Sequence, residues 1–129
     1  TSVRVAPQMI GLGLLETIPE SAILAHADPD DENNDGISGR PNQVWDIQQE
    51  KTVMGRFGWK ANQPDITQQS AGAFHGDMGL TTPLIPQQPC SEVQSNCLEA
   101  RHGGQPEVSA EIFEKVIFCS SVILHNINL

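Results

Sequence analysis

Aromatic and apolar residues are scarce in this chain, and the scarcity limits what it can build. It contains no tyrosine, 5% of its residues are aromatic and 38% are hydrophobic. The longest apolar run, MIGLGLL, has seven residues including two glycines, far short of the roughly 20 residues that a membrane-spanning helix needs. Glycine (11) and proline (9) are abundant, so we expect a thin core in a loop-rich fold, or a segment that packs against something else.

Positive charge is also scarce. The 129 residues include 7 lysines and arginines against 16 acidic residues, which gives a formal net charge of −9. This balance repels a phosphate backbone, so we predict that the chain does not bind nucleic acid. No secretory signal is recognisable and the chain opens on Thr1, so we expect a single domain or a mature or trimmed fragment of a longer protein.

Catalytic signatures are missing as well. The four histidines (His26, His75, His102 and His125) show no metal-ligand spacing. No Ser-His-Asp set, phosphate-binding loop or paired-carboxylate site stands out. A free-standing enzyme therefore has no catalytic constellation behind it.

The three cysteines divide between a polar loop and an apolar run. Cys90 and Cys97 lie in PCSEVQSNCLEARHGG, and two thiols so close in a loop predict a local disulfide and an oxidising compartment, periplasmic or extracellular. The alternative is a zinc site that adds His102, although a fourth ligand at a standard spacing is missing. Cys119 lies in VIFCSSVIL, where we expect a buried, inert thiol.

The periodicity predicts a mainly α-helical fold with long loops and one small β-hairpin. Helices are expected at 6–18, 19–27, 62–79 and 109–124, hairpin strands at 43–48 and 52–59, and turns and loops over 80–106. Pro19 and Pro64 suit the first turns of their helices, Gly79 suits a helix end, and Ser109 suits a cap. Ile112, Phe113, Val116, Ile117, Ile123 and Leu124 form an apolar stripe on the last helix.

Two glycines inside the first predicted helix need a reason, because glycine is costly there. Gly11 and Gly13 permit either a close contact with another helix or the close approach of a flat ligand.

The acidic stretch DPDDENNDGISGRPN, residues 28–42, resembles part of a calcium-binding loop. With Asp31 first, Asn33 and Asp35 take the third and fifth ligand positions, Gly36 takes the sharp turn, and the carbonyl of Ile37 takes the seventh position. The twelfth position is Asn42 rather than a bidentate glutamate. We therefore predict weak Ca²⁺ binding, with Kd about 10⁻⁴ to 10⁻³ M, unless a further carboxylate such as Asp28 or Asp46 completes the shell.

Two other interpretations of this stretch remain open. One is a solvated acidic turn in which Asp and Asn side chains bond their own backbone. The other makes Arg40 and Arg56 internal ion-pair partners of the acids.

The stretch GRFGWKA, residues 55–61, gathers Arg56, Trp59 and Lys60 between glycines. Two cations and an indole can face a flat anionic ligand, because a guanidinium binds carboxylates in a fork. The alternative is a turn whose cations pair with nearby acids.

Taken together, GLGLLE, DGISGR, GRFGWKA and DMGLT, in this order along nearly the whole chain, resemble the bacterial di-haem oxidoreductases. This family is peroxidase-like, is also labelled thiol oxidoreductase-like, and is related to di-haem cytochrome c peroxidases. The resemblance implies a piece of a cytochrome c peroxidase-like fold and a periplasmic c-type cytochrome. Such a protein moves electrons between two haems and a substrate or redox partner protein.

The chain departs from this family in lacking Cys-x-x-Cys-His, the motif that attaches haem c. The resemblance therefore implies a segment between the haem-bearing parts of a longer protein, without covalent haem of its own. Within it, Arg56 and Lys60 would meet haem propionates, and Trp59 or Trp45 would relay electrons. Cys119 stands where the family pattern leads us to expect a tyrosine. The competing hypothesis is a calcium-stabilised extracellular structural or binding module with no redox role.

Overall fold

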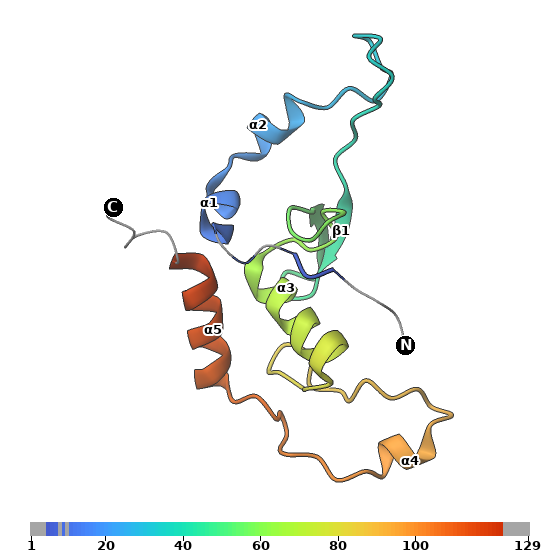
Figure 1. Ribbon diagram of the computed structural model, residues 1–129, viewed down its shortest axis with the longest axis vertical. Helices are drawn as coiled ribbons and strands as arrows, with labels where there is room; N and C mark the ends of the chain where they lie inside the picture. Colours follow the sequence, from blue (N-terminus) through green and yellow to red (C-terminus); the bar gives the residue numbers. More distant parts are fainter. Residues whose placement is uncertain (1–4, 8, 10, 123–129) are drawn as a thin grey trace.

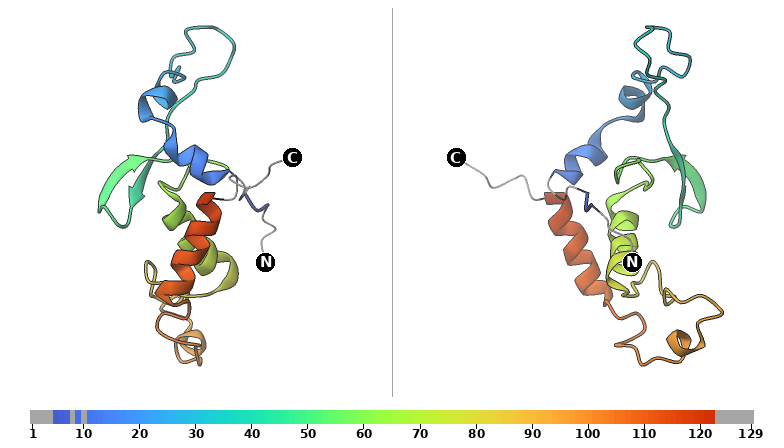
Figure 2. Two further views of the ribbon diagram at one scale, coloured as in Figure 1. Left: turned by 90° about the vertical axis from the view of Figure 1, so that its left-hand side faces the viewer. Right: turned by 45° about the vertical axis from the view of Figure 1, so that its right-hand side comes forward.

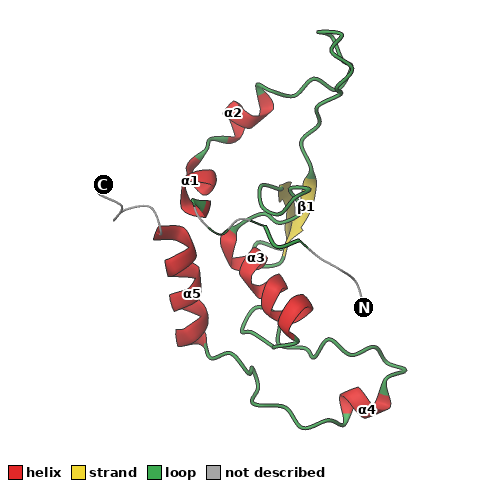
Figure 3. Ribbon diagram, viewed as in Figure 1, coloured by secondary structure: helices red, strands yellow, loops and turns green. Residues whose placement is uncertain are grey.

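The computed structural model describes residues 5–7, 9 and 11–122, which form helices, one hairpin and long loops (Figures 1 and 3). The α-helices of this part are α1 (Leu12–Thr17), α2 (Glu20–Leu24), α3 (Ile66–Ala73), α4 (Ser95–Leu98) and α5 (Ala110–Val122). A π-helical turn, η1 (Phe74–Met78), continues α3, and strands β1 (Gln43–Asp46) and β2 (Lys51–Met54) pair in an antiparallel hairpin. The acidic loop and the α4 loop lie at opposite ends of an elongated molecule (Figure 1).

The first two helices form on either side of Pro19, as predicted, but they are shorter than 6–18 and 19–27. Gly11 is the N-cap of α1 with φ 83°, a left-handed conformation that residues before it cannot continue as a helix. Pro19 is the N-cap of α2 rather than part of its first turn. Neither helix contains a buried residue, so packing does not extend them beyond one or two turns.

Gly13 allows α1 to pack directly against the backbone of α5. A Cβ added at Gly13 would lie 2.1 Å from the carbonyl oxygen of Ser121. The close helix contact, one of the two explanations offered by the sequence, therefore accounts for Gly13. Gly11 is required by its backbone conformation instead.

The hairpin is anchored to α3 by one buried amide. Gln68, 8% exposed, accepts a hydrogen bond from Ile47 N (2.8 Å) and donates one to Trp45 O (2.9 Å). Both predicted strands are present, but the second ends at Met54 instead of continuing to residue 59. Beyond it, Gly55 turns the chain so closely that an added Cβ would lie 1.9 Å from Ala61 O.

Helix α3 begins later than predicted and its end changes pitch. Asp65 is the N-cap, with its carboxylate accepting from Gln68 N at 2.7 Å, so Pro64 precedes the helix instead of occupying its first turn. The π-helical turn η1 then leads to Gly79, which adopts the left-handed conformation (φ 71°) and ends the helix as predicted.

The main core lies between α3 and α5, which run side by side in every view (Figure 2). Phe74 and Phe113 meet edge to face with ring centroids 6.2 Å apart. The buried residues Ala71, Val108 and Phe113 are covered by Phe74, Leu80, Leu84, Ile85 and Ile117. The predicted apolar stripe of α5 is thus only partly used, because Ile112 remains 55% exposed. Ile123 and Leu124 lie outside the described residues.

The predicted cap of α5 is present, with Ser109 Oγ accepting from Ile112 N at 3.3 Å. The predicted loop over 80–106 additionally contains the single-turn helix α4. No helix within residues 11–122 is both long and apolar enough to cross a membrane.

Glu107 ties the long α4 loop to the body. Its carboxylate accepts from Gly103 N (3.0 Å) and Thr81 N (3.1 Å), and also from Gln88 Nε2 (3.3 Å). The two backbone hydrogen bonds, that of Gly103 first, hold the pKa of Glu107 below its usual value because they stabilise the charged form. The chain entering and leaving the loop is thereby clamped at one carboxylate.

Candidate functional site

Residues 55–63 form a tight loop that presents the predicted cofactor-facing side chains. Phe57, 1% exposed, anchors it, and its backbone pairs with that of Gln63 in both directions (3.0 and 3.2 Å). Asn42 Nδ2 reaches across to Lys60 O and Ala61 O (3.1 and 3.0 Å). These contacts fix the loop, so that Trp59 and Lys60 project outward from a rigid base.

Two adjoining cavities open beside this loop. An apolar cavity of about 470 Å³ lies among α1, the loop and α3, and its lining includes Met9, Leu12, Leu15, Arg56, Phe57 and Trp59. A polar cavity of about 730 Å³ lies on the other side of Trp59, and its lining includes Lys60, Asn62, Gln63 and Gln69. Trp59 and Asp77 line both. The structure thus brings Arg56, Trp59 and Lys60 to one region but divides the two cations between two cavities.

Arg56 has a structural role that the sequence did not indicate. Its Nη1 group donates to the carbonyl oxygens of Ile18 and, at 3.5 Å, Leu15 at the end of α1. A cation is favourable there because helix C-termini expose unpaired carbonyls. The guanidinium has five N–H donors, so this contact does not exhaust its capacity to bind a carboxylate in the apolar cavity.

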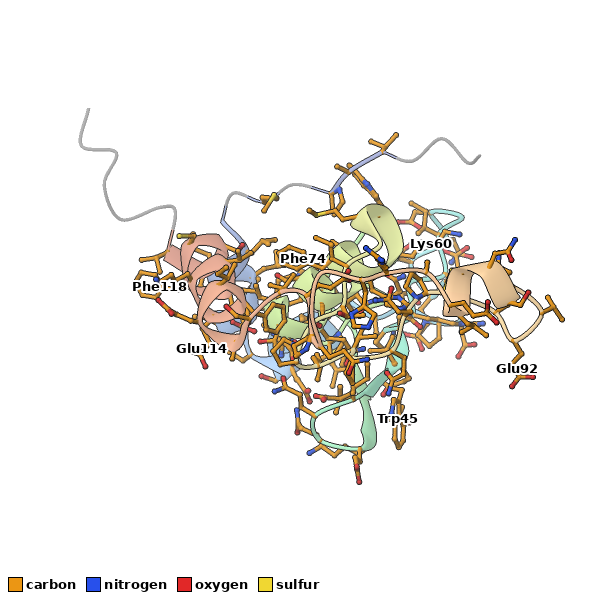
Figure 4. The ribbon with its side chains drawn as sticks, turned by 90° about the horizontal axis from the view of Figure 1, so that it is seen from below. Trp45, Lys60, Phe74, Glu92, Glu114 and Phe118 are labelled. Atoms are coloured by element: carbon orange, nitrogen blue, oxygen red, sulfur yellow. A yellow bond between two sulfur atoms is a disulfide. The ribbon has the colours of Figure 1, made fainter. Side chains whose placement is uncertain are left out.

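Trp59 and Lys60 are both exposed, Trp59 by 71%. The indole Nε1 donates to Val5 O at 3.0 Å and so holds the segment at residues 5–7 across the cavities. Trp45 is also exposed and lies elsewhere, on β1; Figure 4 shows it projecting from a different side of the molecule than Lys60.

Several lining residues escaped prediction from the sequence. Gln63, Gln69 and Asp77 are polar residues within a predicted helix, a pattern that ordinarily marks a solvent-facing side. Only the π-helical turn η1 hints at a function, because such turns are common at functional sites, and it has no sequence signature here.

The acidic loop has the sharp turn predicted for it, with Gly36 at φ 84°. The carboxylate of Asp31 accepts from Gly36 N (3.2 Å), Asn33 Oδ1 from Asp35 N (2.8 Å), and Asp35 Oδ1 from Ile37 N (2.8 Å). These are the local side-chain-to-backbone bonds of the solvated-turn interpretation. Within residues 11–122, no cluster of three or more His, Cys, Asp or Glu side chains has a metal-binding arrangement. Calcium binding through Asp31, Asn33, Asp35 and Ile37 O stays a prediction.

The proposed ion pairs of the two arginines are wrong. Arg40 Nη2 donates to Pro29 O at 2.7 Å and closes the base of the acidic loop, as Arg56 closes α1. Both guanidinium groups satisfy backbone carbonyls, because the loop carboxylates are already engaged with the loop's own N–H groups.

The cysteines follow the sequence in one case and not in the other. Cys90 and Cys97 form the predicted disulfide, which removes the thiols that a zinc site with His102 would need. The expectation of a buried Cys119 is wrong, since its thiol is exposed. It lies one residue before the buried Ser120 on α5, and an apolar run in sequence does not say which side of a helix faces the core.

The apolar cavity is suitable for the edge of a haem. Its volume lies in the range of about 300–1,000 Å³ of small-molecule sites, and apolar side chains with one guanidinium suit an apolar ring that carries carboxylates. Its lining contains no histidine, so the described residues of this cavity offer no imidazole to the iron. These features make it a surface against which a haem held elsewhere can pack.

Comparison with known proteins gives one result. No curated protein and no solved structure matches the chain. A family model described as "di-haem oxidoreductase, putative peroxidase" matches residues 1–124, nearly the whole sequence. The resemblance carried by GLGLLE, DGISGR, GRFGWKA and DMGLT is thereby confirmed, and the chain belongs to the di-haem oxidoreductase family.

Proposed function

We propose that this chain is a segment of a periplasmic di-haem c-type oxidoreductase with a peroxidase-like activity in electron transfer. The family match over residues 1–124 carries the proposal. The chain lacks Cys-x-x-Cys-His, so in this proposal the haems are attached to other parts of the same protein. Its helices and long loops form one piece of a cytochrome c peroxidase-like fold, inactive without the remainder.

The disulfide supports the proposed location. Cys90 and Cys97 are joined within an exposed loop, and such bonds persist in the periplasm or outside the cell. The exposed Cys119 has no second thiol beside it in the structure, so a dithiol activity gains no support from these residues.

The apolar cavity is the proposed contact with a haem. A bound haem supplies one-electron chemistry at its iron. Leu12, Leu15 and Phe57 would cover its apolar ring, and Arg56 would hold a propionate with the donors it does not use at the end of α1. Trp59 borders the cavity and is exposed, so it is the aromatic side chain best placed to lie between that haem and a redox partner.

A calcium-stabilised extracellular module is the second candidate. Its support is the left-handed turn at Gly36, which places Asp31, Asn33 and Asp35 around one short loop in the register of the calcium motif. Calcium binding is compatible with the first function, but the second function excludes haem.

Two measurements separate these functions. Sequencing the gene on both sides of this segment should find Cys-x-x-Cys-His motifs if the first is correct, and finding none would contradict it. In the second, the purified chain is titrated with haemin and followed by Soret absorbance and tryptophan fluorescence. Trp59→Leu should weaken binding, whereas Trp45→Leu, a matched change at an exposed tryptophan away from both cavities, should not. After denaturing extraction no haem should remain; retained haem would contradict the assignment as a segment without covalent haem.

A further inference from the structure

The polar cavity differs from the apolar one in ways that the proposed contact with haem does not explain. Its volume is about 730 Å³, and it lies among the 58–63 loop, α3 with η1, and residues 5–7. Five polar side chains line it: Lys60, Asn62, Gln63, Gln69 and Asp77. Neither Arg56 nor the leucines of α1 belong to its lining.

Gln63 contains an unused hydrogen-bond acceptor in this cavity. Its side-chain Oε1 atom is buried and accepts no hydrogen bond, an uncommon and destabilising state for such an atom. The backbone of Gln63 is fixed by its pairing with Arg56 and Phe57, and its Nε2 atom lies on the Gly72 side of the cavity, 3.8 Å from where a Cβ of that glycine would be. The acceptor is therefore held in place, and a ligand N–H or O–H would satisfy it.

The remaining groups indicate a neutral ligand. Lys60 and Asp77 bring opposite formal charges to the same cavity, and the amides of Asn62, Gln63 and Gln69 each carry donors and an acceptor. Hydroxyl groups match such a mixture because each one both donates and accepts. The indole of Trp59, whose Nε1 is bonded to Val5 O, adds an apolar surface to the same wall.

We propose that this cavity binds a neutral polyhydroxylated molecule of the monosaccharide class. A ligand hydroxyl donates to Gln63 Oε1, other hydroxyls meet Lys60 and the Asn62 and Gln69 amides, and the C–H face of the ring packs on Trp59. The site is independent of haem, so it stands or falls separately from the proposed function.

The experiment is an NMR titration of the ¹⁵N-labelled 129-residue chain with D-glucose. Saturable shifts are expected for the Trp59 indole and the Gln63 and Gln69 amides, but not for the Trp45 indole. Sodium acetate, which offers a charge and no hydroxyl, should leave these signals unchanged at equal ionic strength. Gln63→Leu should weaken glucose binding about tenfold, the cost of one hydrogen bond to a buried acceptor. Gln87→Leu, a matched change at an exposed glutamine outside the cavity, should not.

Thermal unfolding of the two variants keeps the result interpretable. Gln63→Leu should be no less stable than Gln87→Leu, because its side-chain acceptor has no partner to lose. Saturable glucose shifts that depend on Gln63 in a folded variant support the proposal. Absence of saturable shifts, equal shifts with acetate, or undiminished binding by Gln63→Leu would each overturn it.

Discussion

Two parts of this molecule are organised by different forces. The body, residues 43–85 with 108–120, contains all the side chains buried within the described residues, whereas the acidic arm, residues 19–42, contains none. The arm is held by side-chain-to-backbone bonds between residues two to five apart, by the bridge between Asp28 and Gly39, and by Arg40 on Pro29 O. Both cavities with large volumes belong to the body and the segments against it.

The difference teaches where a ligand would matter most. A segment without buried apolar surface gains little from the hydrophobic effect, so its order depends on local bonds and on any ion it binds. The body has its own core, and ligands there meet a preformed surface. The following tests are ordered by the size of their expected effects.

Core truncation should separate the body from its surface most strongly. Phe113→Ala removes a side chain that is 5% exposed and contacts Phe74, and should lower the unfolding free energy by about 3–5 kcal/mol. Phe118→Ala, on the same helix but 66% exposed and on its outer side (Figure 4), should change it by no more than about 0.5 kcal/mol. Urea unfolding measures both, and similar losses would mean that the outer side of α5 is covered in solution.

Calcium should act on the arm alone. With a Kd of about 10⁻⁴ M, 10 mM Ca²⁺ would add about 2.7 kcal/mol of stability to the structure that binds it. Asp31→Ala and Asp35→Ala should abolish the gain, while Glu32→Ala, outside the ligand positions of this register, should keep it. Thermal melts and arm amide-exchange rates at constant ionic strength make the measurement. Equal effects of Ca²⁺, Mg²⁺ and NaCl would indicate screening and contradict a calcium site.

The disulfide should matter more than the free thiol. Replacing Cys90 and Cys97 together by serine opens a loop of about eight residues and should cost about 2.5 kcal/mol in the chain-entropy model. Cys119→Ser, at an exposed position on α5, is the matched control and should be nearly neutral. A neutral double variant would show that the α4 loop folds independently of its covalent closure.

Glu107 should give the smallest effect, with a defined pH dependence. Its folded pKa lies below the usual value, so its contribution to stability is full above the unfolded pKa and is lost as pH falls through the folded one. Glu107→Gln should therefore be less stable than the wild type at neutral pH, with the difference shrinking below about pH 4.5. Denaturant melts across this range provide the check, and a difference that grows as pH falls would contradict the assignment.

Local signals in the sequence predicted many elements of this fold. Pro19 separated two helices, Asp65 and Ser109 marked helix starts, Gly79 marked an end, and the spacing of Cys90 and Cys97 marked the disulfide. Each of these depends on residues within a few positions of one another. The family resemblance likewise followed from short motifs in a fixed order.

Long-range features were not predictable in the same way. Arg56 reaches Ile18 across 38 positions, Trp59 reaches Val5 across 54, and Gly13 meets Ser121 at the far end of the chain. The exposed side of α5 at Cys119 also depends on which neighbour covers the helix. No periodicity within one segment contains this information.

The sequence by itself thus determined the mainly helical class, the hairpin, the disulfide loop, the acidic turn and the family. Only the tertiary structure decided that Arg56 and Lys60 border different cavities, that Gln63 has a buried acceptor without a partner, and that the acidic arm is separate from the core. The physical reason is range: caps, turns and loop closure act between near neighbours, whereas cavities and buried polar atoms arise where distant segments pack.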